Sequence, residues 1–506
     1  MIIDHYLRTT PNPLPAAAAF LSFGQIIVSA GSSAKNSIGA PALLAAGTAG
    51  GIPVAVIVTL LAVGLIYCWA RAEMLQKVAY YDELTGLLGW WRFEYLAQKL
   101  FRKNPCGYAL VTADIDGFRT LNGIYGKKQG DELLKAIAKS LTKQLERGEL
   151  VCRIQSDNFA FVLRYRDKDG LAARINDIAV ILKGLKCCDF SYNMYFGICT
   201  DPEEKDTIID LRLKAELAML SIKGSTQVTH GFYCEKLRQR LLAERAIENF
   251  ALSALSNNEF EVYFQPQYDI VSNKIIGAEA LSRWRQQDGG LLMPGSYTRV
   301  FERNGFILQL DRYMIRKACE LLKSWMEEGL DIVPISVNLS RLHIFNPKFC
   351  QSAANIADRY KIPRSMLVFE LTEGVFLENT GRLMEFVAEL RSNGFCVSID
   401  DFGAGYSTLG LVSQLTADIL KIDRNFFGPG EITPRAKVII REIIHMATQL
   451  GMRIIAEGVE TRSQAEFLLE TGCRMAQGFY FARPMTAQSF KQLLSAKPGT
   501  ASKLSG

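Results

Sequence analysis

The sequence predicts an α/β protein in which a (β/α)8 TIM-like barrel follows a smaller α+β domain and an apolar N-terminal segment. About eight strand-like runs, separated by helical patterns, follow one another across roughly the last 250 residues. Polar residues mark these runs, and Asn338, Glu370 and Asp400 lie 32 and 30 positions apart, about the length of one strand–helix unit. Near the N-terminus, residues 52–70 carry no charge.

The strand-like runs of the C-terminal half are EVYFQPQ, IIGAEAL, VPISVNL, MLVFELT, FCVSIDD, ADILKID, MRIIAEG and MAQGFYF. Helical patterns between them lie at residues 313–327, 382–392, 436–450 and 463–470. In a β/α barrel, the loops at the C-terminal ends of the strands carry the chemistry. An open parallel sheet is the structural alternative, but it does not gather residues from every strand end into one mouth.

Composition narrows the function classes. At 506 residues the chain is too long for one hydrophobic core. A net charge of +6 and 49% apolar residues argue against disorder and against a surface that coats nucleic acid, so no DNA or RNA partner is expected. Eleven scattered cysteines without a CxxC spacing indicate reduced thiols and a cytoplasmic location for most of the protein. Only four histidines, none near another, disfavour zinc and favour hard cations bound by oxygen.

Residues 1–78 are predicted to form a membrane anchor. Residues 52–70 are long enough to cross a bilayer as a helix. Residues 14–31 are a weaker stretch, either a second span or the core of a signal peptide. Two spans with both ends inside are preferred, because Arg8 and Arg71 then lie on the same face of the membrane.

Residues 79–231 are predicted to be an α+β domain. Its predicted elements are a buried strand at 107–113 that ends at Asp114, a helix at 130–145, a hairpin at 150–163 that turns at Gln155–Asn158, a strand at 191–199 and a helix at 208–223. Residues 232–255 form a charged amphipathic helix, most simply a linker to the barrel domain at 256–496, and residues 497–506 are a tail.

Carboxylates recur at the ends of the C-terminal runs. They are Glu279, Glu370, Glu373, Asp400, Asp401, Asp423, Glu457 and Glu460, with Lys421 beside Asp423. Acidic residues next to buried strands are costly unless they bind something. The pattern therefore predicts an oxygen-rich metal site assembled from strand ends. Taken singly, each of these residues has a structural alternative as a helix cap, a turn residue or a surface ion-pair partner.

Eight motifs occur in order across residues 250–490: QPQ at Gln265, EALSRW at Glu279, VNLS at Asn338, FELTE at Glu370, DDFGAGYSTL at Asp400, LKID at Lys421, AEGVET at Glu457 and QGFYFARP at Gln477. A lone EAL triplet is a weak signal, whereas eight ordered motifs over half of the chain are specific. By these motifs the chain resembles EAL domains, which hydrolyse the bacterial second messenger cyclic di-GMP.

The resemblance implies a catalytic site with two Mg²⁺ or Mn²⁺ ions. The first ion would be held by Glu279, Asn338, Glu370 and Asp400, and the second by Asp401 with Asp423. Lys421 would orient or help deprotonate the nucleophilic water, and Glu457 would contact a metal ion or that water. All these family positions are present, which predicts an active barrel.

The resemblance also implies contacts to substrate and to a second subunit. Arg283 would meet a phosphate, Gln265 and Gln477 would touch guanine or the metal-bound water, and Glu460 is a further substrate-binding candidate. Glu373 and the loop at residues 403–409, with Gly403 and Gly405, resemble the segment that couples the metal site to dimerisation. A homodimer through the EAL domain is therefore expected.

Residues 79–231 resemble a GGDEF domain, the module that makes cyclic di-GMP from two GTP molecules. The matching residues are Asp114, Asp116, Asn122, Asp131, Asp157 and Lys223. Where the family has GGDEF, this chain has QSDNF at residues 155–159, and the two missing glycines remove backbone freedom at the nucleotide phosphates. Cyclase activity is therefore not expected. Two roles stay open: binding GTP, with Asp114, Asn122, Asp131 and Asp157 as candidates, to activate the barrel, or an inert dimerisation spacer.

The sequence thus predicts a phosphodiesterase at the inner (cytoplasmic) membrane, with both domains in the cytoplasm, that opens cyclic di-GMP to linear pGpG. Two alternatives remain. One is a receptor that binds cyclic di-GMP without hydrolysing it and signals through a protein partner. The other is a bifunctional cyclase and phosphodiesterase, which the QSDNF hairpin opposes.

Overall fold

The computed structural model describes residues 62–68, 70–71, 80–185, 190–203, 205–225, 228–372, 380–403, 416–428 and 430–496. The chain divides into two compact units, Met1–Arg238 and Gln239–Gly506. The predicted span at 14–31, and most of that at 52–70, lie outside the described residues. Within the described part of the chain, no helix is both long and apolar enough to cross a membrane.

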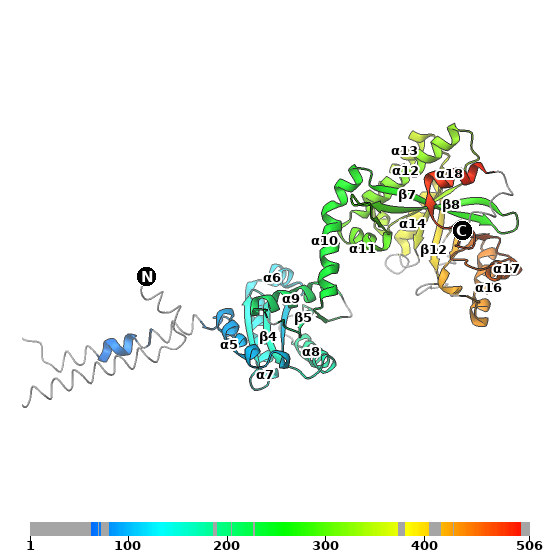
Figure 1. Ribbon diagram of the computed structural model, residues 1–506. Helices are drawn as coiled ribbons and strands as arrows, with labels where there is room; N and C mark the ends of the chain where they lie inside the picture. Colours follow the sequence, from blue (N-terminus) through cyan, green and yellow to red (C-terminus); the bar gives the residue numbers. More distant parts are fainter. Residues whose placement is uncertain are drawn as a thin grey trace, which may run out of the picture. The chain divides into compact units, whose positions relative to one another are not determined.

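The first unit is built on one six-stranded sheet in the order β1–β3–β4–β2–β5–β6 (Figure 1). The strands are β1 (Leu88–Gly89), β2 (Tyr108–Ile115), β3 (Leu150–Gln155), β4 (Asn158–Arg164), β5 (Met194–Cys199) and β6 (His230–Phe232). The helices are α5 (Trp90–Lys103), α6 (Phe118–Tyr125), α7 (Lys127–Gln144), α8 (Lys168–Lys183) and α9 (Ile208–Leu220). The neighbouring strands β3, β4, β2 and β5 pair antiparallel.

The central strand β2 explains why this unit has helices on both faces of its sheet. Side chains alternate along a strand, and every residue of β2 is buried. Ala109 and Val111 pack in the core formed with α7 and α8, whereas Tyr108 and Leu110 pack in the core formed with α5 and α9. The predicted buried strand is confirmed, although it runs one residue beyond Asp114.

The predicted hairpin is also confirmed. β3 and β4 pair antiparallel, and Gln155 pairs with Asn158 across the turn. Ser156 adopts φ +52°, a left-handed conformation that glycine takes without cost. The missing glycines therefore do not prevent the turn, but they leave Ser156 in an unfavourable backbone conformation.

The second unit is a closed eight-stranded barrel, which confirms the barrel and excludes the open sheet. Its ring contains β7 (Phe260–Asp269), β8 (Lys274–Arg285), β10 (Ile335–Asn338), β11 (Leu367–Thr372), β12 (Cys396–Phe402), β13 (Ile419–Ile422), β14 (Arg453–Ala456) and β15 (Met475–Ala476). Parallel pairs join β8 to β15 in ring order, and β7 closes the ring by antiparallel pairing with both β8 and β15. Two short strands, β9 (Leu291–Leu292) and β16 (Met485–Thr486), extend β8 and β7.

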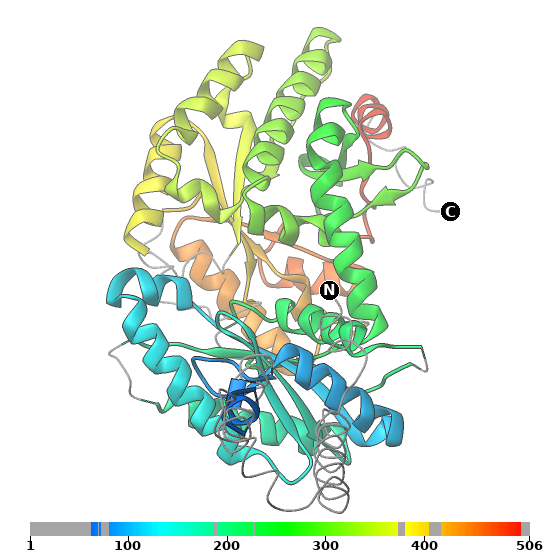
Figure 2. The same cartoon turned by 90° about the vertical axis from the view of Figure 1, so that its left-hand side faces the viewer.

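The helices of this unit lie outside the barrel strands (Figures 1 and 2). They are α10 (Glu235–Ser256), α11 (Pro294–Asn304), α12 (Ile307–Glu327), α13 (Phe349–Tyr360), α14 (Thr380–Ser392), α16 (Pro434–Gln449), α17 (Arg462–Glu470) and α18 (Ala487–Ser495). Outward-facing strand residues such as Phe369 and Leu420 share one large core with these helices. Helix α10 begins in the first unit and ends in the second.

One expectation about the strands is wrong. The run that contains Glu279 was expected to end near this residue, but β8 continues six residues further, to Arg285. The reason is the hairpin with β7, whose antiparallel pairing extends from Phe260 opposite Trp284 to Asp269 opposite Lys274. Glu279 therefore lies in the middle of its strand, directly opposite Gln265.

Candidate metal-binding active site

Alternation along the strands places polar side chains above an apolar floor inside the barrel. The floor is a cluster of Val368, Cys396, Ile419, Ile455 and Met475. Two residues later in the chain come Glu370, Ser398, Lys421, Glu457 and Gln477. Because side chains two apart on a strand point to the same face, these residues share the barrel interior with the floor. The acidic groups thus gather because their strands are adjacent in the ring.

Lys421 lies at the centre of four carboxylates. Its Nζ is 2.8 Å from Glu370 Oε2, 3.3 Å from Glu279 Oε2, 3.2 Å from Asp400 Oδ1 and 2.5 Å from Glu457 Oε1. The Lys421 side chain is 1% exposed, so water cannot screen these charges. The structure therefore brings together five of the residues that the sequence assigns to the site.

One ammonium cannot satisfy this set of carboxylates. Its N–H bonds point to Glu279 and Glu370. Among the described residues, Glu370 Oε1 is buried without a hydrogen-bond partner, and Asp400 Oδ1 and Glu457 Oε1 lie beside the ammonium without an aligned hydrogen bond. Buried anionic oxygens without donors are unfavourable unless a cation binds them. The donor set consists only of hard oxygens, so the residues fit Mg²⁺ or Mn²⁺.

The pKa values follow the same imbalance. Burial raises the pKa of Glu370 well above its ordinary value, and the neighbouring carboxylates add to this shift against the pull of Lys421. Burial likewise raises the pKa of Glu457 to about 8. Glu279 is the exception: burial acts to raise its pKa, but Lys421, together with hydrogen bonds from Gln477 and Asn338, lowers it. Burial disfavours the charge of Lys421, yet the four carboxylates raise its pKa well above the ordinary value.

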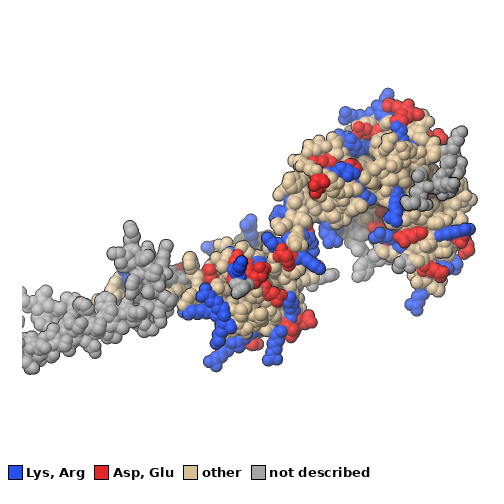
Figure 3. All heavy atoms as spheres, viewed as in Figure 1, with Lys and Arg blue, Asp and Glu red and all other residues tan. Residues whose placement is uncertain are grey.

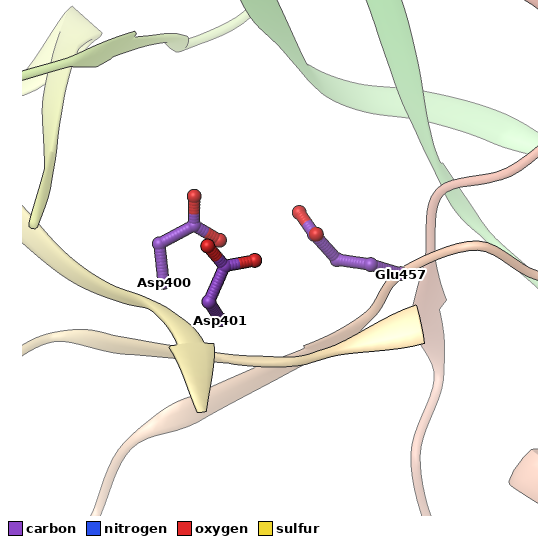
Figure 4. A group of neighbouring side chains, drawn as sticks. All are labelled: Asp400, Asp401 and Glu457. Atoms are coloured by element: carbon purple, nitrogen blue, oxygen red, sulfur yellow. The ribbon is translucent and has the colours of Figure 1, made fainter. Parts of the chain in front are cut away.

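Asp400 and Asp401 reach the same site because β12 is irregular at this point. Consecutive side chains on a regular strand point to opposite faces, but the pairing of β12 with β13 shifts between Ile399 and Phe402, and Asp401 adopts φ +53°. Carboxylate oxygens of Asp400, Asp401 and Glu457 consequently lie within 4.8 Å of one another, and Figure 4 shows the three groups facing a common space. Burial, then the neighbouring Asp400 and Asp423, raise the pKa of Asp401 to about 6.

Amide side chains hold the orientation of Glu279. Asn338 Nδ2 donates to Glu279 Oε1 at 2.8 Å, and Gln477 Nε2 donates to Glu279 Oε2 at 2.7 Å. Gln477 also donates to Gln265 at 3.1 Å and accepts a hydrogen bond from Gln267 at 3.1 Å. Sequence reasoning missed Gln267, although its position two residues after Gln265 on one strand predicts the same face.

Arg283 is buried in the same strand as Glu279. Its Nη1 donates to the backbone carbonyl of Ser282 at 2.8 Å, and its guanidinium lies 5.6 Å from the centroid of the Tyr263 ring. Burial lowers the pKa of Arg283. No ion pair between described residues involves this side chain, so it offers a guanidinium fork suited to a phosphate.

A cavity of about 490 Å³ borders Asn338. Leu281, Pro294 and Met314 line it with apolar surface, and Asp311 adds a buried carboxylate. A volume of this size suits a small-molecule ligand.

Asp311 also fixes the turn that follows Asn338, and sequence reasoning missed it. Asp311 Oδ2 accepts the backbone N–H of Ser340 at 2.9 Å and lies 3.1 Å from Nε2 of the fully buried His343. Burial raises the pKa of Asp311. These residues stand about thirty positions apart without a motif, so only the fold reveals their contact.

Some predicted residues do not join the cluster. Glu460 is exposed just before α17, and its backbone N–H donates to Gln464; no described hydrogen bond or ion pair links its side chain to Lys421 or the carboxylates. Glu373 and Gly405 lie outside the described residues. Gly403 follows β12 with φ +93°, and a Cβ there would collide with the ring of Phe426, so this position needs glycine.

The first unit also holds a smaller polar group. Asp114 forms an ion pair of 2.5 Å with Lys223. Burial raises the pKa of Asp114, with Asp157 contributing through its charge. Within the described part of the chain, Asn122 Oδ1 is buried without a hydrogen-bond partner, and it lies against Gly130, the residue before Asp131. Among the described residues, no hydrogen bond or ion pair joins Asp114 to Asn122 or Asp131.

Comparison with known proteins assigns each unit to a family. A model of the EAL domain matches residues 248–484, and a model of the diguanylate cyclase GGDEF domain matches residues 79–228. The bifunctional diguanylate cyclase/cyclic di-GMP phosphodiesterase MucR of Pseudomonas aeruginosa is 29% identical over 438 residues, which is 84% of this chain and 63% of MucR. The cyclic di-GMP phosphodiesterase NbdA of the same organism is 29% identical over 428 residues, which is 83% of this chain and 55% of NbdA.

A solved structure of the PaMucR phosphodiesterase in complex with c-di-GMP is 33% identical to the chain, with a TM-score of 0.46, and the match covers 48% of this chain and 99% of that one. The chain spans less than two thirds of the length of MucR and NbdA. The matched families follow one another in the order of the two units and together cover most of the chain. By the two family models, the protein therefore carries a GGDEF domain followed by an EAL domain.

Proposed function

We propose that the EAL domain hydrolyses cyclic di-GMP to linear pGpG with two Mg²⁺ or Mn²⁺ ions. The observation that carries this proposal is the group of four carboxylates that share the one buried ammonium of Lys421, with Glu370 Oε1 buried and without a hydrogen-bond partner among the described residues. A domain that only needed a stable core would not keep four carboxylates on one buried ammonium. Such a group suits divalent cations and a phosphodiester substrate.

Each residue of the cluster has a proposed role. Glu279, Asn338, Glu370 and Asp400 would hold the first ion, and Asp401 with Asp423 the second. Together the ions would supply a reactive water at neutral pH and neutralise charge on the phosphate. Asn338 suits this task, because its amide N–H is bound to Glu279 and no hydrogen bond between described residues engages its oxygen.

The remaining residues would bind and orient the reactants. Lys421 and Glu457, which lie 2.5 Å apart, would orient the attacking water. Arg283 would bind a phosphate oxygen, for which its fork geometry is suited. The cavity beside Asn338 would take one guanine, with Leu281 and Pro294 against the base.

We further propose that the GGDEF domain is not a cyclase and acts as a regulatory domain that binds GTP. Asn158 stands where a carboxylate is expected, and Ser156 holds a turn that favours glycine. The retained Asp114, Asn122, Asp131 and Asp157 support nucleotide binding. Titration of GTP into a cyclic di-GMP hydrolysis assay tests this role. If neither the rate nor the substrate affinity changes, the domain is the inert dimerisation spacer instead.

Two properties of the whole protein complete the proposal. Residues 52–70 would anchor it in the inner membrane, with both domains in the cytoplasm, and the EAL domain would form a homodimer. Membrane flotation after carbonate washing tests the anchor. Light scattering of the detergent-solubilised chain tests the dimer.

The catalytic proposal is tested with the purified full chain and labelled cyclic di-GMP. We expect pGpG to form with Mg²⁺ or Mn²⁺ and its formation to stop when a chelator is added. A second measurement is independent of turnover: the same ions should raise the melting temperature of the chain. A metal ion at a free concentration a hundred times its dissociation constant stabilises the folded state by about 2.7 kcal/mol. Tight binding of cyclic di-GMP without pGpG would instead establish the receptor alternative.

A further inference from the structure

Helix α5 presents an outer face of unusual composition in the first unit. Phe93, Ala97 and Phe101 bury the inner side of the helix. The opposite side carries Trp91, Tyr95, Lys99, Arg102 and Lys103, all exposed, and we call these residues the outer face of α5. They fall within about one third of the helix circumference, because positions i, i+4, i+8 and i+11 lie on one face.

The charge of this face has one sign. Lys99, Arg102 and Lys103 lie on it, and Arg92 lies at its edge. No ion pair between described residues involves any of the four. Glu94, the one acid of the helix, lies on the flank away from Lys99. In Figure 3, Lys and Arg side chains gather on the part of this unit where Figure 1 labels α5.

Aromatic rings accompany these cations. Lys99 Nζ lies 4.4 Å from the centroid of the Tyr95 ring, and the Arg92 guanidinium lies 4.9 Å from that of Tyr80. Trp91 is 80% exposed among the described residues, which leaves the large apolar surface of its indole in water. Exposed Trp and Tyr beside Lys and Arg are typical of surfaces that meet the headgroup region of a bilayer.

We propose that the outer face of α5 rests on an anionic lipid surface. Trp91 and Tyr95 enter the interface between headgroups and acyl chains, and the basic residues bind lipid phosphates. The helix begins 20 residues after the uncharged run 52–70, so a chain segment of at most about 70 Å separates the two. This second contact is independent of the acidic site, and it would hold the GGDEF domain against the membrane.

Reactivity of lysines tests the contact in the full chain. The protein is reconstituted into vesicles of phosphatidylcholine, with or without phosphatidylglycerol, and treated with a water-soluble acylating reagent. We expect labelling of Lys99 and Lys103 to fall about ten-fold in the anionic vesicles, in line with the attraction of basic residues to anionic lipid. Lys127 and Lys128, exposed on α7, are internal controls and should label equally in both.

A charge-reversal variant gives a second readout. Lipid that carries a quencher in its headgroup should quench the fluorescence of Trp91 in the wild type, and this quenching should be lost in K99E/R102E/K103E. The contribution of Trp91 is obtained by subtracting the fluorescence of the matching protein that also carries W91F. The control K127E/K128E should retain quenching, and both variants should hydrolyse substrate in detergent as the wild type does.

Three results would overturn the proposal. Equal protection in neutral and anionic vesicles would rule out an anionic surface. Absence of protection in both would rule out lipid contact. Protection in detergent that grows with protein concentration would assign the face to a second copy of the chain.

Discussion

Two buried glutamates, one in each unit, show how differently the protein treats an acid in its interior. Glu149, just before β3, is 7% exposed, and each carboxylate oxygen accepts two hydrogen bonds. Arg174 donates to both oxygens at 2.7 Å, and the backbone N–H groups of Glu146 and Arg164 donate at 2.7 and 2.8 Å. Glu370 in the barrel is 1% exposed, but among the described residues it has a single donor, Lys421, shared with three other acids.

The pKa values of the two glutamates move in opposite directions. Burial acts to raise the pKa of Glu149, yet Arg174 and the two backbone N–H groups lower it. Burial raises the pKa of Glu370, and one shared ammonium does not reverse this. A buried acid with full hydrogen bonding stabilises the fold, whereas one with an oxygen left over is a place for a cation.

The same substitution at both positions should therefore act on different properties. We expect Glu370→Gln to reduce the rate of cyclic di-GMP hydrolysis by about 10³-fold, because it removes an anionic ligand from the metal site. Without metal its melting temperature should not fall, since one of four crowded charges has gone. Steady-state hydrolysis and thermal unfolding in a chelator measure the two effects.

The control for that experiment is Glu149→Gln, which should hydrolyse cyclic di-GMP at nearly the wild-type rate. A Glu370→Gln protein that loses stability without metal, in step with its activity, would show that Glu370 is a structural acid like Glu149.

Stability is where Glu149→Gln should act. The substitution leaves the half-buried Arg174 guanidinium with only the more distant carboxylate of Glu146, 3.9 Å away, which costs about 2 kcal/mol. Hydrogen exchange of the β3 and β4 amides in the full chain measures the loss locally. Exchange in the barrel strands should not change, and equal acceleration in both units would contradict the assignment.

Lowering the pH should remove the same contribution of Glu149 to the stability of the first unit. Because folding lowers the pKa of Glu149, its stabilising effect is complete above the ordinary glutamate pKa of about 4.3. It disappears as the pH falls through the lower pKa of the folded state. The stability difference between the wild type and Glu149→Gln should therefore shrink below about pH 4. A difference that stays constant to pH 2 would show that the carboxylate charge is not involved.

The polar residues of the barrel interior were predictable because each follows an apolar, strand-like run. Glu370, Lys421 and Glu457 each follow an apolar run whose alternation assigns them to the interior. The side to which Asp401 points was not predictable, since it depends on a bulge and a left-handed backbone. The reversed strand β7 was also hidden, because a strand-like run carries no information on its direction.

Contacts between distant polar residues were the other limit. Asp311 and His343 carry no motif, and their pairing appears only when α12 packs beside β10. Glu460 fitted the pattern of acids after a strand, but the chain turns into α17 at this point and leaves it exposed. Motif spacing therefore identifies which residues are polar for a reason, and the fold decides which of them meet.

The smallest predicted effect concerns two turns between neighbouring strands, one in each unit, that contain a non-glycine residue at positive φ. Ser156 joins β3 to β4 at φ +52°, and Asn273 joins β7 to β8 at φ +51°. Asparagine adopts this conformation at a lower cost than serine, so Ser156→Gly should stabilise the first unit by about 1 kcal/mol. Asn273→Gly should change the stability of the barrel by less, and hydrogen exchange of the flanking strands measures both. If Ser156→Gly instead destabilises the hairpin, contacts of the serine side chain outweigh its backbone strain. The absence of the two family glycines would then stabilise the hairpin, although it removes the backbone freedom needed at nucleotide phosphates.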